Sequence, residues 1–200
     1  MLFNSFEFLV FLPIVFLLYW FAFKKLRAQN LFVVVASYLF YGWWDWRFLI
    51  LIAFTTLCSY ASGILLERQE GHRHIQRLIS IANIVLNLTI LGIFKYFNFF
   101  SENLQHLFQW FGFELDWVTL DILLPVGISF YTFQALSYTI DIYRHKMKPT
   151  HDIVAFFAFI SFFPQLVAGP IERATNLLPQ FERQRAFDYT AAVDGMRQIL

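Results

Sequence analysis

An apolar stretch at residues 123–144, LLPVGISFYTFQALSYTIDIYR, limits the possible folds of this chain more than any other feature. A helix that crosses a bilayer needs about 20 mostly apolar residues, and this stretch is long enough. Polar groups without partners are costly in lipid. Yet one helical face of the stretch carries polar and small residues at steps of four and three: Gly127, Tyr131, Gln134, Tyr138 and Asp141. This face must therefore meet protein or a water-filled cavity.

Two interpretations of this polar face are open. Most hydroxyl and amide groups inside membranes form hydrogen bonds between helices, which would make the face a structural contact of a helix bundle. The same groups would also suit the wall of a substrate passage. The spacing of the residues does not distinguish the two.

The composition places the chain among membrane proteins. Of its 200 residues, 58% are hydrophobic and 14% are charged, whereas soluble domains are about 45–50% apolar and ~25% charged. The apolar residues lie in long runs, which predicts an all-α polytopic membrane protein. A net charge of +1 provides no broad positive field, so we expect no nucleic-acid partner. The single cysteine, Cys58, excludes an internal disulfide and forms no metal-binding pattern.

The apolar runs predict five membrane spans. They cover residues 6–23, 31–44, 48–66, 78–100 and 122–143. The first run is followed by Lys24, Lys25 and Arg27 rather than preceded by basic residues, so it is a retained span and not a signal peptide. In the third run, Ser59 and Gly63 form a small-xxx-small step that favours close helix packing.

The loops give the orientation of these spans. Loops 24–30, 67–77 and 144–152 are basic, whereas segments 1–5 and 101–121 contain no Lys or Arg. Basic loops stay in the cytoplasm, so the N-terminus is expected outside a membrane that the chain crosses five times. Within the acidic outer segment, Leu104 and Phe108 belong to an expected amphipathic helix lying on the surface.

Residues 153–168 form a sixth apolar segment of a different kind. It is short, both its flanks are basic, and Pro164, Gly169 and Pro170 break its end. A crossing would place Arg183 and Arg185 outside, so we predict a re-entrant or interfacial segment; a short tilted crossing is the alternative. Irregular backbone at membrane depth must be buried in protein or line a cavity.

The C-terminal residues 189–200 predict an amphipathic helix. No Gly, Asn or Pro stop signal follows its pattern, from which we expect the sequence to be the front part of a longer chain.

No complete catalytic constellation is present in the sequence. There is no Gly-rich phosphate loop, no HExxH and no GxSxG. All five histidines fall in expected loops or surface helix: His72, His74, His106, His145 and His151. Asp141 with Arg144, and Asp45 with Arg47, are spaced to form ion pairs. Glu172 and Arg173 suit either binding of an anionic group or a solvated loop.

Three stretches resemble the bacterial membrane-bound O-acyltransferase (MBOAT) family, and in particular the membrane subunit of alginate O-acetylation. They are YLFYGWWDWRFL (38–49), LPVGISFYTFQALSYTIDIYR (124–144) and FISFFPQLVAGPIERATNLLPQF (159–181), and the opening MLFNSFEFLVFLPIVFLLYW is similar too. The resemblance runs end to end. It implies one MBOAT-type region over residues 1–200, with a ring of helices around a thin centre.

The resemblance also implies a function. An acetyl group from an inner-side donor, acetyl-CoA or an acyl carrier acting as co-substrate, would pass through the bacterial cytoplasmic (inner) membrane for O-acetylation of a secreted polysaccharide such as alginate. The implied partners are the lipid bilayer, extracytoplasmic acetyl-transfer proteins and the polysaccharide acceptor, and no bound cofactor is implied. The implied substrate-passage candidates are Gln134, Tyr138, Asp141, Gly169, Pro170 and Arg173.

One departure from the family pattern affects the expected activity. The hallmark histidine of the family lies in a later membrane segment of a longer chain, and nothing here matches it. Transfer to a hydroxyl needs a base, so no residue is assigned as catalytic and this chain alone is expected to be inactive. The alternatives are a non-catalytic transporter or assembly scaffold and, within the family, teichoic-acid D-alanyl transfer.

Overall fold

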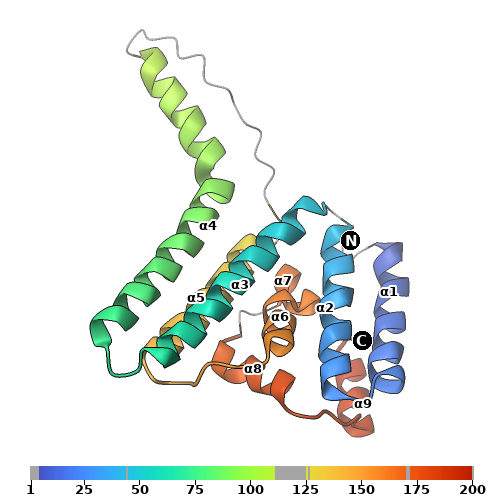
Figure 1. Ribbon diagram of the computed structural model, residues 1–200. Coiled ribbons are helices and arrows are strands. Elements are labelled where there is room, and N and C mark those ends of the chain that lie inside the picture. Colours follow the sequence, from blue (N-terminus) through green and yellow to red (C-terminus); the bar gives the residue numbers. More distant parts are fainter. Residues whose placement is uncertain (1–4, 44, 111–124, 126, 170–171, 200) are drawn as a thin grey trace.

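The computed structural model describes residues 5–43, 45–110, 125, 127–169 and 172–199, and these residues form an all-helical bundle (Figure 1). The α-helices are α1 Phe6–Leu17, α2 Leu26–Gly42, α3 Arg47–Arg68, α4 Arg73–Trp110, α5 Ile128–Tyr143, α6 Ile153–Ser161, α7 Phe163–Ala168, α8 Ala174–Glu182 and α9 Tyr189–Ile199, and a π-helical turn, η1 Leu18–Ala22, continues α1. The all-α prediction is thus confirmed. By length and hydropathy, α3 and the Arg73–Ser101 part of α4 can cross a membrane.

The helix limits differ from the predicted spans where polar residues join an apolar run. Helix α2 begins at Leu26 rather than at residue 31, and its first turns bury Gln29 and Asn30. Asn30 donates to the Phe181 carbonyl at 2.7 Å, so a polar turn that hydropathy excludes is stabilised by packing.

Helix α4 also continues beyond the predicted span. It runs unbroken to Trp110, 38 residues and about 57 Å at 1.5 Å per residue. The separate surface helix expected around Leu104 is therefore a wrong prediction: no Gly or Pro interrupts residues 101–110, so this stretch is the end of α4. The rest of the expected surface segment, residues 111–121, lies outside the described residues.

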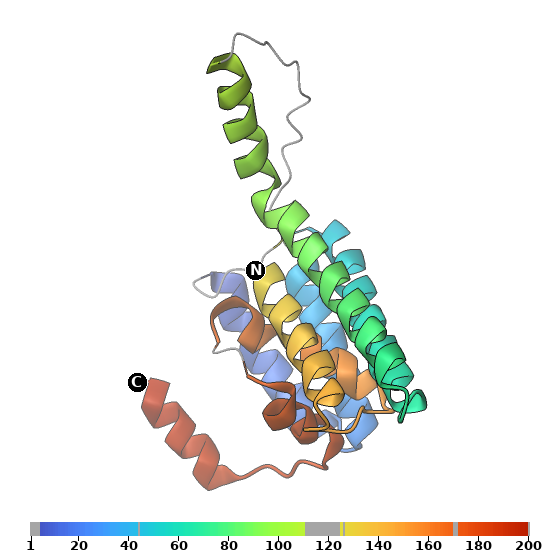
Figure 2. The same ribbon diagram turned by 90° about the vertical axis from the view of Figure 1, so that its left-hand side faces the viewer.

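Helix α5 occupies the centre of the bundle, where it contacts α3, α4, α6, α7 and α8 (Figure 2). Its polar stripe is buried: Tyr131 and Gln134 are 1% exposed, and Tyr138 is completely covered. The prediction that this face meets protein rather than lipid is confirmed. Among the described residues of α5, Phe133 is the large apolar side chain that stays exposed.

Buried hydrogen bonds join α3, α4 and α5. Asn83 on α4 donates through Nδ2 to the Thr139 hydroxyl on α5 at 2.7 Å. Asn87 donates to Asn83 Oδ1 at 3.2 Å and to the Ser59 hydroxyl on α3 at 3.4 Å. All four side chains are buried, so here the polar residues hold helices together.

The sixth apolar segment is broken in two. Its first half, α6, is capped by Asp152, whose carboxylate accepts from the Val154 and Ala155 amides. The helix ends at Phe162, and the Phe163 amide then donates to Ser37 Oγ on α2 at 3.2 Å. The sequence predicted that Pro164, Gly169 and Pro170 break the end of the segment. Helix α7 does end before Gly169, but the internal break lies at Phe162 and not at Pro164. Proline is tolerated in the first turn of a helix and disturbs the residues before it, so Pro164 lies at the start of α7.

Both ends of the α6–α8 segment lie at the same end of the bundle. At its start, the Tyr60 hydroxyl donates to the His151 carbonyl at 2.9 Å, and the His151 ring lies 3.0 Å from the Glu67 carboxylate near the C-terminus of α3. At its end, Phe181 is bound by Asn30 near the N-terminus of α2. Since α2 and α3 are antiparallel neighbours, the chain enters and leaves at one end (Figure 1).

Candidate functional site

Tyr138 is the centre of the junction between α3, α5 and α6. Its ring packs on Gly63, where a Cβ atom would lie only 2.7 Å from the ring, and its centroid is 4.5 Å from that of Phe156. Its hydroxyl accepts the Thr150 amide at 3.2 Å. The Ser59–Gly63 step thus provides the close approach that small residues allow. In this geometry Tyr138 has the contacts of a packing residue.

Gln134 lies one turn away and is bonded differently. Its Oε1 atom is buried and has no hydrogen-bond partner within the described part of the chain. The same holds for the Tyr131 hydroxyl and the Thr132 Oγ1, both on α5. Buried polar atoms are nearly always paired with protein or water, so these three mark a section of the interior that water or a ligand would complete.

Asp141 is buried near the end of α5, with 7% of its surface exposed. The predicted pair with Arg144 is wrong: in the described part of the chain, none of the ion pairs involves Arg144, which is exposed. Arg144 caps the helix through its backbone amide instead. The pair of Asp45 and Arg47 is confirmed at 2.9 Å. Hydrogen bonds from Arg47 hold the pKa of the Asp45 carboxyl below its ordinary value.

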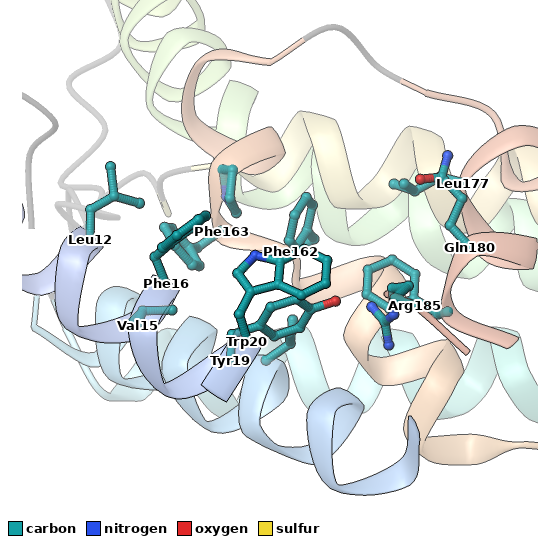
Figure 3. Close-up of a pocket in the computed structure, with 13 residues that line it drawn as sticks. Leu12, Val15, Phe16, Tyr19, Trp20, Phe162, Phe163, Leu177, Gln180 and Arg185 are labelled. Atoms are coloured by element: carbon teal, nitrogen blue, oxygen red, sulfur yellow. The ribbon is translucent and has the colours of Figure 1, made fainter. Parts of the chain in front are cut away.

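Two pockets flank the break between α6 and α7. The larger, about 450 Å³, lies between α1, η1, α2, α7 and α8 (Figure 3). The smaller, about 240 Å³, brings Gly169 and Glu172 to the other side of the break. Phe162, Pro164 and Leu177 line both pockets, so the break forms a wall between them.

The passage candidates predicted near the break do not lie together in one pocket. Gly169 lines the smaller pocket, where a Cβ atom would lie 2.8 Å from the Gln165 Cα, so only glycine fits. Pro170 lies outside the described residues. Arg173 is exposed at the N-cap of α8 and lines neither pocket.

The α5 stripe does not open into these pockets, because Gln134, Tyr138 and Asp141 line neither of them. Sequence reasoning missed Arg185, which lies in the larger pocket and bonds Asn30. Its position beside Arg183 resembles an ordinary basic flank. The one available signal was Asn30, a polar residue at the start of an apolar run.

The described histidines lie apart from both pockets. His72, His74, His145 and His151 are exposed, and no cluster of three His, Cys, Asp or Glu side chains that could hold a metal occurs in the described ranges.

Comparison with known proteins identifies relatives along nearly the whole chain. The probable alginate O-acetylase AlgI of Pseudomonas aeruginosa is 40% identical over 185 residues, 92% of this chain and 35% of the relative. The corresponding protein of Pseudomonas putida is 39% identical and is covered to 38%. The peptidoglycan O-acetyltransferase of Helicobacter pylori is 31% identical over 91% of this chain and 39% of its own length.

These relatives confirm the resemblance to alginate O-acetylation proteins. The chain spans a little over a third of the length of these relatives. No family model matches the chain, and no solved structure matches it significantly.

Proposed function

We propose that this chain, which is homologous to the alginate O-acetylases over 92% of its length, is part of a membrane-bound O-acyltransferase. In this proposal the complete enzyme passes an acetyl group across the bacterial inner membrane for O-acetylation of a secreted polysaccharide, with alginate as the first candidate acceptor. The observation that carries the proposal is the 40% identity over 185 residues. Peptidoglycan is the second candidate acceptor, since one relative is a peptidoglycan O-acetyltransferase.

A multi-pass membrane setting is supported by the outer surfaces of the helices. Large apolar side chains face outward along α1 and α4, among them Phe6 and Leu9 at 78% and 68% exposed and Leu78 and Phe100 at 68% and 67%. Each Å² of such surface costs about 25 cal/mol in water. A lipid environment removes that cost, so we propose that residues 6–23, 31–44, 48–66, 78–100 and 122–143 cross the membrane with the N-terminus outside.

The re-entrant path of α6–α8 is also supported by geometry. Helix α6 has nine residues, or about 14 Å, which is less than half of a hydrocarbon core of ~30 Å. The segment begins beside Glu67 and returns to Asn30, and both contacts lie next to basic loops of the proposed cytoplasmic side. A path that enters and leaves at this side keeps Arg183 and Arg185 in the cytoplasm.

Within this setting, the residues here provide the passage and not the chemistry. The smaller pocket at Gly169 and Glu172 is the proposed inner opening, facing the donor, acetyl-CoA or an acyl carrier. The buried polar atoms of Tyr131 and Gln134 are the proposed polar section. Attack by a sugar hydroxyl needs a base, and we assign none to these residues; the rest of the enzyme supplies it in this proposal.

The test is a gene replacement in the source bacterium with the full-length protein. Proton NMR of the secreted polysaccharide and of digested peptidoglycan would measure their O-acetyl content after deletion and after re-expression. We expect one of the two polymers to lose its acetyl groups after deletion and to regain them after re-expression. Polymer that is exported less but acetylated normally would refute the enzyme in favour of a transporter.

A matched pair of variants on α5 probes the passage. Gln134→Leu removes the buried unpaired oxygen, whereas Phe133→Leu changes the neighbouring exposed side chain. We expect acetylation to fall at least about tenfold only in Gln134→Leu at equal protein level, which corresponds to about 1.4 kcal/mol of lost transition-state stabilisation. Equal acetylation in both variants would remove Gln134 from the passage.

A further inference from the structure

Arg185 is a half-buried cation without a carboxylate partner. Among the described residues its contacts are neutral: it donates through Nη2 to the Asn30 side-chain oxygen, and its guanidinium lies 5.3 Å from the ring centroids of both Tyr19 and Phe181. Its Nε is buried and unpaired. Burial lowers the pKa of the Arg185 guanidinium, yet arginine keeps its proton in proteins. A half-buried positive charge therefore remains without a counter-ion among the described residues.

The groove beside Arg185 is long, apolar and polar at one end only (Figure 3). Along α1 and η1 its wall runs from Leu12 to Trp20, and the floor is formed by Phe162 and Phe163. The polar side-chain atoms come from Tyr19, Trp20, Gln180 and Arg185, near the α1–α2 turn. Its volume of about 450 Å³ lies within the ~300–1,000 Å³ range of small-molecule sites.

The placement of the groove favours an occupant from the bilayer. Leu12 and Phe16, at one edge, are each 43% exposed on the outer side of α1, which faces lipid in the proposed membrane setting. Arg185 lies at the end of the bundle that carries Lys24, Lys25 and Arg27, where headgroups of the cytoplasmic leaflet would be. An acyl chain in the groove would thus point toward the bilayer centre, with its headgroup at the guanidinium.

We propose that this groove is a binding site for an anionic phospholipid, whose acyl chain packs along α1 and whose phosphate pairs with Arg185. The charge complementarity distinguishes this occupant from a zwitterionic lipid, because only a net negative headgroup neutralises the unpaired cation. The inference rests on the proposed membrane setting and on no catalytic step. It goes beyond acyl transfer, because the site lies across the break from the smaller pocket.

Trp20 lines the groove and can report its occupant by fluorescence. The full-length protein, with Trp20 as its only tryptophan, would be reconstituted in two kinds of vesicle. One contains brominated phosphatidylglycerol in unlabelled phosphatidylcholine, and the other contains brominated phosphatidylcholine in unlabelled phosphatidylglycerol. Bromine quenches tryptophan on contact. We expect an association constant about fivefold higher for phosphatidylglycerol, the ratio for one arginine near an anionic headgroup. Equal quenching by the two lipids would overturn the proposal.

Three variants assign the preference to Arg185. Arg185→Gln is expected to abolish it, whereas Arg183→Gln, which removes the same charge from an exposed neighbour, should leave it unchanged. Arg185→Lys keeps the charge and should retain most of the preference. Because Arg185→Gln also breaks the bond to Asn30, its helicity and size-exclusion profile are compared with the parent. Loss of the preference in a folded Arg185→Lys, or in Arg183→Gln, would refute the assignment.

A second reporter separates this proposal from the proposed function. Trp43, 65% exposed at the opposite end of α2, would be the only tryptophan in a parallel protein. If bromolipids quench Trp43 but not Trp20, another part of the full-length protein fills the groove and the lipid site is refuted. If they quench neither residue, the membrane setting itself fails.

Discussion

The contact between Gly63 and Tyr138 allows a stability prediction to be worked from the structure. A methyl group on Gly63 would lie 2.7 Å from Tyr138 Cε1 and from its hydroxyl. The ring cannot easily retreat, since it is completely buried, packs on Phe156 at 4.5 Å and accepts the Thr150 amide. Overpacking of this kind costs about 1–3 kcal/mol.

Gly92 on α4 is the matched control, because nothing lies within 4 Å of a Cβ atom there. Both Gly→Ala changes gain the helix propensity of alanine, about 0.5–1 kcal/mol, so the difference between them isolates the clash. We expect Gly63→Ala to be less stable than Gly92→Ala by about 1–3 kcal/mol. Equilibrium unfolding in mixed detergent micelles, followed by circular dichroism, measures both.

A double mutant identifies the ring as the cause. Tyr138→Leu removes the ring atoms that the methyl group would meet, so Gly63→Ala should cost less in that background, with a coupling of about 0.5–3 kcal/mol. If Gly63→Ala and Gly92→Ala have equal stability, or if the coupling is zero, α3 does not pack closely on α5 through Gly63 and Tyr138.

The remaining predictions concern the buried network, the outer loop and the re-entrant segment. Asn83→Val leaves the hydrogen-bond partners of Asn83 unpaired and should lower the free energy of unfolding by about 1–3 kcal/mol. Thr89→Val, on the exposed side of α4, should change it by no more than about 0.5 kcal/mol. Equal changes for both variants in mixed-micelle unfolding would contradict the network. The pKa of the Asp45 carboxyl, measured by NMR titration, should lie below its ordinary value and return toward it in Arg47→Gln. The ion pair stabilises the folded protein above the unfolded-state pKa, and this stabilisation is lost as the pH falls through the lowered folded-state pKa. An Asp45 titration midpoint that is the same in Arg47→Gln would refute the pairing. A cysteine at position 175, replacing Thr175 in a cysteine-free protein, should react with impermeant maleimide only from the cytoplasmic side, and labelling from outside would mean a full crossing.

The sequence predicted features that depend on the spacing of residues along a helix. It missed features that depend on a hydrogen bond to a residue far away in the sequence. The α5 stripe could be found because polar residues at steps of four and three must share a face, whatever surrounds them. The start of α2 could not, since Gln29 and Asn30 are polar. Gln29 donates to the Tyr19 carbonyl, and Asn30 donates to the Phe181 carbonyl, 151 positions away. The break at Phe162 likewise depends on Ser37, 126 positions away from Phe163.

Arg185 shows the same limit for the candidate site. Beside Arg183 it resembles one more basic residue of a cytoplasmic flank, and only the fold gives it Asn30 and two aromatic rings as neighbours. Arg173, which the resemblance made a passage candidate, is exposed and lines neither pocket. Charge in a sequence therefore predicts on which side of the membrane a loop lies, but not which arginine is left without a counter-ion.

The hydrogen bonds along α5 divide the polar stripe into two halves with different roles. Toward the C-terminus, Tyr138 accepts the Thr150 amide and Thr139 accepts from Asn83, which is the structural interpretation of the stripe. Toward the N-terminus, Tyr131 and Gln134 keep buried atoms without partners.

The unsatisfied half of α5 is also the half that approaches the broken segment. Gly127, with φ +80°, precedes α5, and a Cβ atom there would lie 3.1 Å from the Leu166 carbonyl on α7. Unpaired polar atoms cost free energy that packing alone does not return. The proposed passage should therefore run beside Tyr131 and Gln134, next to α7, rather than beside Tyr138.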